Sequence, residues 1–133
     1  MSPEIEALAR RAVACMPIER WPDWTPVSVW GPGEDPYEYH GYLDTEEGGP
    51  VVVTFCFTTC RKAYKTLPRL DTPAGLGSLL AVVRGAWPGW HVQVIAYADD
   101  TPAEVEVAKG YDAIPFMDDT VAAALILALE AAP

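Results

Sequence analysis

Two cysteines and two histidines are the side chains of this sequence that could form a soft-metal site or a nucleophilic pair. Cys56 and Cys60 are four residues apart, and on an extended strand this spacing separates them by roughly 13 Å, too far to share one zinc ion. Only a break in the strand at Thr58 would bring them together, and only His40 and His91 remain as further soft ligands. A nucleophilic Cys56 with His40 as its base would need neighbouring strands, and a buried thiol explains the cysteine equally well. We therefore expect no metal, no cofactor, no catalytic residues and no enzymatic activity.

Carboxylates crowd residues 99–119, in the second half of the chain, and Lys109 is the one base within this range. One interpretation is a surface that binds Arg- and Lys-rich targets, and the other is an ordinary solvated face. A divalent-metal site or a glycosidase pair has no spacing motif here to support it. Glu104 and Glu106 share the outer face of an expected strand because they are two residues apart. The candidate partner-binding residues are Asp99, Asp100, Glu104, Glu106 and Asp112.

A basic segment, residues 61–69, supplies an alternative site. It carries four of the nine bases of the chain and no acid. Guanidinium and ammonium groups are the usual ligands of phosphate. The alternative function is therefore a protein that sequesters a small ligand such as a nucleotide signal, held by Arg61, Lys62, Lys65 and Arg69.

The overall charge narrows the class of partner. The chain has 133 residues with 19 acids against 9 bases, a net charge of −10. Such a surface repels nucleic acids and acidic membranes, so the natural complement is a basic protein, although acidity also serves solubility alone.

No apolar run reaches the roughly 20 residues of a membrane span. Three cysteines and a start that lacks the bases of a signal peptide favour a reducing, intracellular compartment.

The best-defined element is a helix over residues 73–87, around which the others are arranged. Thr72 is expected as its N-cap, Pro73 as its first residue, and Pro88 with Gly89 as its stop. After it, residues 90–97 and 103–108 alternate between apolar and polar, which is typical of a hairpin with one solvated face. An irregular segment over residues 110–116 and a last apolar helix from Asp118 follow.

The first half is expected to contain one helix and three antiparallel strands. An amphipathic helix ends before Pro17, and strands follow at residues 27–30, 37–43 and 51–59. The predicted fold class is α+β, with an antiparallel sheet of about five strands, helices packed on it and the order α-βββ-α-ββ-α. We expect a single domain, residues 1–133, made of a first half (1–60), a basic linker (61–70) and a second half (71–133).

Two segments carry a resemblance to a known group of proteins. PEIEALARRAVAC at residues 3–15 and LPRLDTPAGLGSLLAVVRGAW at residues 67–87 resemble uncharacterised bacteriophage and metagenomic small proteins. The C-terminal part, residues 111–132, is similar to a phage ABA-sandwich domain. The resemblance implies a viral setting and transfers no site residue.

These observations lead to one main functional hypothesis. The chain is expected to be a small acidic phage accessory protein in the host cytoplasm. It would bind and inhibit a basic host protein, such as a defence nuclease, in the manner of an anti-CRISPR protein. It is expected to act without direct contact to nucleic acid or membrane, and a homodimer is left open. The alternatives are the nucleotide-sequestering protein above and a minor virion component.

Overall fold

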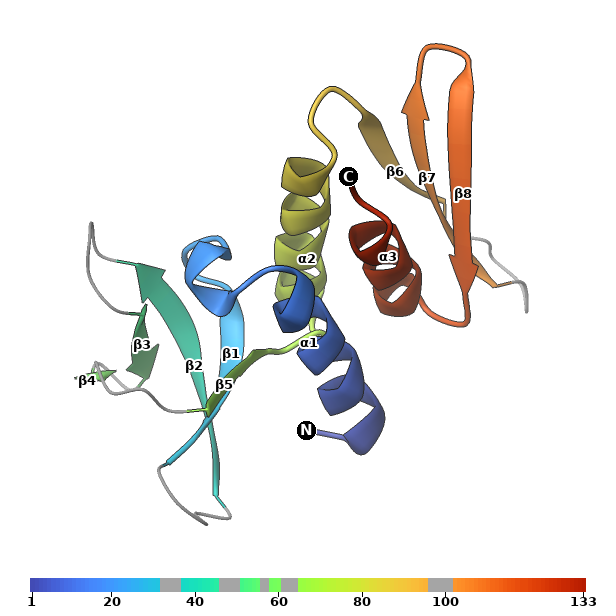
Figure 1. The fold of residues 1–133 in the computed structure, drawn as a ribbon. Coiled ribbons are helices and arrows are strands. Elements are labelled where there is room, and N and C mark those ends of the chain that lie inside the picture. Colours follow the sequence, from blue (N-terminus) through green and yellow to red (C-terminus); the bar gives the residue numbers. More distant parts are fainter. Residues whose placement is uncertain (32–36, 46–50, 56–57, 61–64, 96–101) are drawn as a thin grey trace. The chain divides into compact units, whose positions relative to one another are not determined.

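The computed structural model describes residues 1–31, 37–45, 51–55, 58–60, 65–95 and 102–133 (Figure 1). The fold class is α+β, as predicted, and helices and groups of strands alternate in the predicted order. Five described strands rather than three follow the first helix, and three rather than two precede the last one. The chain forms two compact units, Met1–Ser78 and Leu79–Pro133. Helix α2 (Pro73–Ala86) begins in the first unit and ends in the second. Each unit is described by itself below.

The first unit is built on an antiparallel sheet. Its strands have the order β4-β3-β2-β1-β5, and each neighbouring pair is antiparallel. The buried apolar residues described in this unit are Ala9, Ala12, Trp21, Val27, Val29, Leu43, Leu67 and Leu70. The elements before α2 are α1 (Pro3–Cys15), η1 (Ile18–Arg20), β1 (Pro26–Trp30), β2 (Glu38–Thr45), β3 (Val51–Phe55), β4 (Thr58–Cys60) and β5 (Lys65–Pro68).

Helix α1 packs against β5 and begins where the sequence predicts. The hydroxyl oxygen of Ser2 accepts a hydrogen bond from the amide of Ile5 at 3.3 Å, and proline follows the cap. Acidic side chains in the first turn lie at the positive end of the helix dipole. Ala9 and Ala12 are completely buried, so the small residues of this helix allow close packing.

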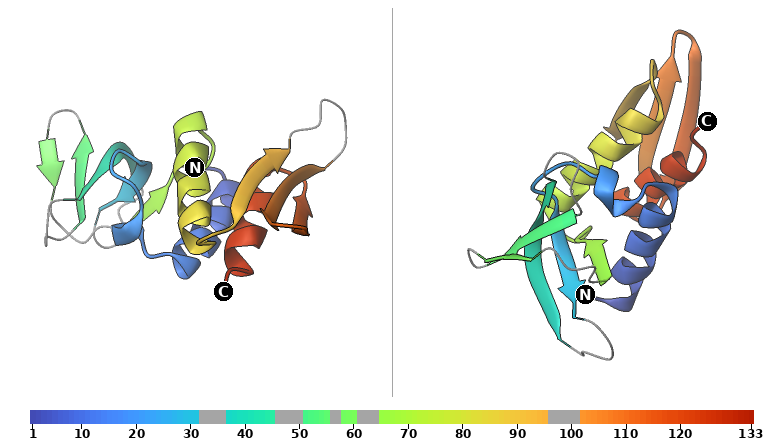
Figure 2. Two further views of the ribbon diagram at one scale, coloured as in Figure 1. Left: turned by 90° about the horizontal axis from the view of Figure 1, so that it is seen from above. Right: turned by 60° about the vertical axis from the view of Figure 1, so that its left-hand side comes forward.

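The second unit is a three-stranded antiparallel sheet with helices on one face. Its order is β6-β7-β8, with β6 at His91–Ile95, β7 at Ala103–Lys109 and β8 at Asp112–Asp118. Helix α3 (Val121–Glu130) packs against β7 and β8 (Figure 2). The core contains Leu79, Val83, Trp87, Val92, Val105, Val107, Leu125, Ile126, Ala128 and Leu129.

The prediction of one sheet of about five strands is wrong, because the described strands form two separate sheets. Residues 51–59, predicted as one strand, are divided between β3 and β4, which pair antiparallel with Phe55 opposite Thr58. The basic linker contains β5. The segment predicted to be irregular around Pro115 is part of β8, and a proline is tolerated there because β8 is an edge strand.

Among the described residues, none of the helices has both the length and the apolar character needed to cross a membrane.

Candidate functional site

The outer face of the β6-β7-β8 sheet carries the two acids that the sequence singled out as a stripe. Val105 and Val107 are completely buried against the helical side of β7. Because side chains alternate along a strand, Glu104 and Glu106 lie on the opposite, outer face. The structure therefore places these two carboxylates side by side on one strand, as predicted.

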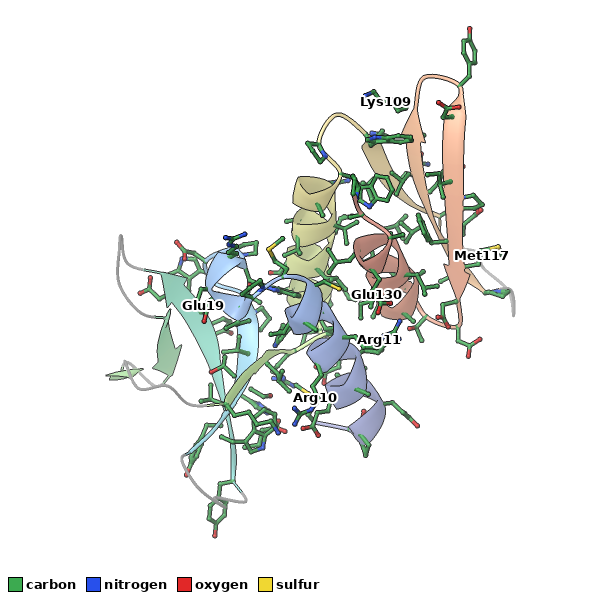
Figure 3. The ribbon with its side chains drawn as sticks, viewed as in Figure 1. Arg10, Arg11, Glu19, Lys109, Met117 and Glu130 are labelled. Atoms are coloured by element: carbon green, nitrogen blue, oxygen red, sulfur yellow. The ribbon has the colours of Figure 1, made fainter. Side chains whose placement is uncertain are left out.

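The register places three apolar side chains and one polar side chain beside the two carboxylates. Glu104 lies between Ile95 of β6 and Met117 of β8, and Glu106 lies between Gln93 of β6 and Pro115 of β8. Met117 is 52% exposed and projects from the side of β8 away from α3 (Figure 3). This outer face thus has two carboxylates at its centre, with Ile95, Pro115 and Met117 as apolar neighbours and Gln93 as a polar one. We call it the acidic face, formed by Gln93, Ile95, Glu104, Glu106, Pro115 and Met117.

The other acids predicted for this surface do not join it in the described structure. Asp112 pairs with Lys109 at the end of the β7-β8 hairpin. Along β8 it alternates in phase with Ile114 and Phe116, which places it on the opposite side of the strand from Met117. Asp99 and Asp100 lie outside the described residues.

The predicted phosphate ligands are already paired where the structure describes them. The ammonium of Lys65 lies 2.8 Å from the Glu6 carboxylate and 4.4 Å from the ring centroid of Trp30. Hydrogen bonds from Lys65 and Arg10 lower the pKa of Glu6. The guanidinium of Arg69 contacts Asp71 at 3.4 Å. Arg61 and Lys62 lie outside the described residues.

A polar network on the first sheet is the feature that sequence reasoning missed. Ser28 faces His40 across the β1-β2 pair, and its hydroxyl donates to Glu38 Oε2 at 3.0 Å. His40 Nε2 lies 2.6 Å from the same carboxylate oxygen, and Arg69 Nη1 lies 3.1 Å from His40 Nδ1. The amino group of Met1 donates to the other oxygen of Glu38. The carboxylate of Glu38 is therefore the common acceptor of three donors.

The hydrogen bonds of this network assign the tautomer of His40. A guanidinium can only donate, so the Nδ1 atom that faces Arg69 must accept. Nε2 then carries the hydrogen that is donated to Glu38. Both ring nitrogens are used within the protein, and Ser28 is completely buried and donates to the carboxylate rather than to the imidazole. This arrangement of Ser28, Glu38 and His40 lacks the serine–base contact that nucleophilic catalysis needs.

Burial alone would raise the pKa of Glu38, but the hydrogen bonds from Met1, His40 and Ser28 outweigh it. The resulting pKa is about 2, against an ordinary value of 4.5. A carboxyl whose pKa is lowered by folding contributes stability above its unfolded pKa and loses it as the pH falls toward the folded value. The network therefore stabilises the first unit at neutral pH and loses this contribution in acid.

We expect Glu38→Gln to reduce the free energy of unfolding at neutral pH and to remove part of the acid sensitivity between about pH 4.5 and pH 2. The expected loss at pH 7 is on the order of 2 kcal/mol, because the folded state no longer gains from the charged carboxylate. Urea unfolding followed by circular dichroism across this pH range measures it. Glu4→Gln removes an exposed carboxylate of α1 and is the control. An unchanged pH dependence in Glu38→Gln would contradict the assignment.

Within the described ranges, no group of three or more His, Cys, Asp or Glu side chains is placed to hold a metal ion. No family model, curated protein or solved structure matches the chain.

Proposed function

We propose that this chain is a non-enzymatic binding protein that engages a basic protein partner through the acidic face. The observation that carries the proposal is the pair Glu104 and Glu106 on the outer face of β7, flanked by Met117 with 52% of its surface exposed. Apolar side chains around a charge exclude water when a partner binds, and this makes a charge-assisted contact stronger.

The charge of the whole chain supports the same kind of partner. A net charge of −10 attracts basic surfaces over a distance of about one Debye length and accelerates their association. The alternative of a nucleotide-sequestering protein gains no comparable support, because Lys65 and Arg69 already contact Glu6 and Asp71. A phosphate would have to compete with these carboxylates.

We further propose the biological setting that the resemblance implies. In that setting the chain is a phage accessory protein in the host cytoplasm, and its partner is a basic host defence protein that it inhibits. A nuclease is a natural candidate, because its nucleic-acid-binding surface is basic and complementary to Glu104 and Glu106.

The test is a pull-down of the tagged protein from host lysate at low and moderate salt, followed by calorimetry with the purified partner. We expect one stoichiometric basic protein whose binding weakens with salt. The double variant Glu104→Lys with Glu106→Lys should weaken the affinity by about 100-fold or more, since each desolvated charge contact is replaced by repulsion.

The matched control carries the same change of net charge elsewhere. Glu4→Lys with Glu19→Lys replaces two exposed acids of the first unit (Glu19 is labelled in Figure 3). It should weaken binding only through the long-range field, by less than about tenfold. Equal losses in the two double variants would show that overall charge, rather than the acidic face, determines binding. Retained binding in Glu104→Lys with Glu106→Lys would refute the proposal.

A further inference from the structure

Trp24 is an exposed tryptophan with an unfavourable backbone conformation. Its φ angle is 66°, the one positive value among the described non-glycine residues, and 65% of its surface is exposed. A left-handed conformation is costly for a residue with a Cβ atom, and glycine or asparagine is the usual choice there. An exposed indole also gains little from burial. Trp24 thus combines an unfavourable backbone conformation with an exposed apolar side chain.

The turn at Trp24 is held by groups other than the indole. Its backbone amide donates to the carbonyl oxygen of Leu43 at 2.7 Å, and the amide of Leu43 donates to the carbonyl oxygen of Thr25 at 2.9 Å. The Thr25 hydroxyl donates to the carbonyl oxygen of Pro22 at 2.6 Å, and Thr25 is completely buried. All these hydrogen bonds use backbone groups or the Thr25 hydroxyl, and none uses the indole. The fold of this turn therefore does not explain why a tryptophan is present.

The indole has one described aromatic neighbour. The ring of Tyr42 lies with its centroid 6.3 Å from that of Trp24, at an interplanar angle of 55°, and Tyr42 is 50% exposed. Along β2, Asp44 alternates in phase with Tyr42 and so shares its face of the sheet. Two exposed aromatic rings and a carboxylate therefore lie together at this end of β2. We call Trp24 and Tyr42 the aromatic pair.

We propose that the aromatic pair is a docking site for a cationic side chain, arginine or lysine, of a protein partner. The face of an aromatic ring attracts a cation, and an indole is the most effective ring for this purpose. The carboxylate of Asp44 and the net charge of −10 favour a cation over an anion at this surface. The nearest described cation along this face is Arg69, whose guanidinium contacts His40, two residues before Tyr42 on β2. Arg69 is also paired with Asp71, which reduces its repulsion of a second cation. Backbone strain at an exposed residue is typical of functional positions.

This site uses residues of the first unit only, whereas the acidic face uses residues of the second. It does not depend on the function proposed above. A partner could use either surface alone, so the two proposals can fail separately.

The experiment follows the indole N–H resonance of Trp24 in the ¹⁵N-labelled full chain. The probe is a short acetylated and amidated peptide with two arginines, and the matched probe replaces both arginines with citrulline, which has nearly the same shape but no charge. The arginine peptide should shift this resonance saturably with a Kd of about millimolar, whereas the citrulline peptide should shift it much less. Equal shifts, or no shift with either peptide, would overturn the proposal.

Two substitutions separate binding from folding. Trp24→Gly removes the indole and fits the positive φ angle, so it should melt no lower than the unmodified chain while the Tyr42 ring no longer responds to the arginine peptide. Tyr111→Ala removes a fully exposed aromatic residue of the second unit and should leave the Trp24 shift intact. A markedly lower melting temperature for Trp24→Gly would show that the indole is structural and would overturn the argument.

Discussion

Gly75→Ala should lower the free energy of unfolding by about 3 kcal/mol or more, although it adds only one methyl group. A Cβ atom at this position would lie 1.8 Å from the carbonyl oxygen of Arg69 and 2.8 Å from its carbonyl carbon. Both neighbours are backbone atoms, so no rotamer change can relieve the overlap. The start of α2 or the segment before it would have to move by more than 1 Å to restore ordinary contact.

That movement would also break the cap of α2. The hydroxyl oxygen of Thr72 accepts the amide of Gly75 at 3.0 Å, while its hydrogen is donated to the carbonyl oxygen of Arg69 at 3.1 Å. One side chain thus ties the first turn of the helix to the chain before it. Loss of an N-cap interaction costs about 1 kcal/mol, which adds to the cost of the steric overlap.

Thermal unfolding followed by circular dichroism measures this effect, and the same helix offers the control. Gly77 is exposed, and a Cβ atom added there would have nothing within 4 Å. Gly77→Ala should therefore raise stability by about 0.5–1 kcal/mol, as usual for a glycine in an exposed helix. We expect the melting temperature to fall by about 10 °C in Gly75→Ala and to rise slightly in Gly77→Ala. Similar melting temperatures for the two variants would contradict the close approach.

The sequence could predict where α2 begins, but it could not predict that Gly75 and Gly77 have different surroundings. Thr72 and Pro73 mark the start of α2 by local chemistry, and the structure begins this helix at Pro73. Nothing local distinguishes Gly75 from Gly77. Only the tertiary position of Arg69 does so, because its carbonyl oxygen approaches one of them.

The same distinction between local and long-range information applies to the candidate site. The outer position of Glu104 and Glu106 follows from the alternation along one strand, so the sequence was sufficient to predict it. The network of Ser28, Glu38, His40 and Arg69 depends on the register between β1, β2 and β5. The spacing of Glu38 and His40 places both on one face of a strand, but no local signal indicates that Ser28 lies opposite His40.

The strands were predicted least accurately where the chain reverses or where proline occurs. The apolar residues at 51–55 predict a strand correctly, but their pattern continues to Thr59 without a turn signal. Pro115 suggested irregular structure, since a proline cannot donate to a sheet. It is compatible with β8 only because that strand lies at an edge, which sequence patterns do not reveal.

Trp87→Ala should destabilise the second unit by about 4 kcal/mol, and Trp87→Phe by about 2 kcal/mol. Trp87 is 5% exposed, and its indole Nε1–H donates to the carbonyl oxygen of Ala128 at 2.8 Å. Ala128 belongs to the last turn of α3, where carbonyl groups lack partners within the helix. The indole at the end of α2 therefore caps the end of α3 by a hydrogen bond between residues 41 positions apart in the chain.

The two substitutions separate this hydrogen bond from packing. The ring centroid of Trp87 lies 5.5 Å from that of Trp90 and 6.4 Å from that of Phe116. Phenylalanine retains much of this apolar ring but leaves the buried carbonyl oxygen of Ala128 unpaired. Alanine additionally leaves a cavity. Urea unfolding gives the two losses, and amide hydrogen exchange in the last turn of α3 should be faster in Trp87→Phe than in the control Trp90→Phe. If Trp87→Phe exchanged and unfolded like Trp90→Phe, the carbonyl of Ala128 would not need the indole, and packing alone would hold α3 in place.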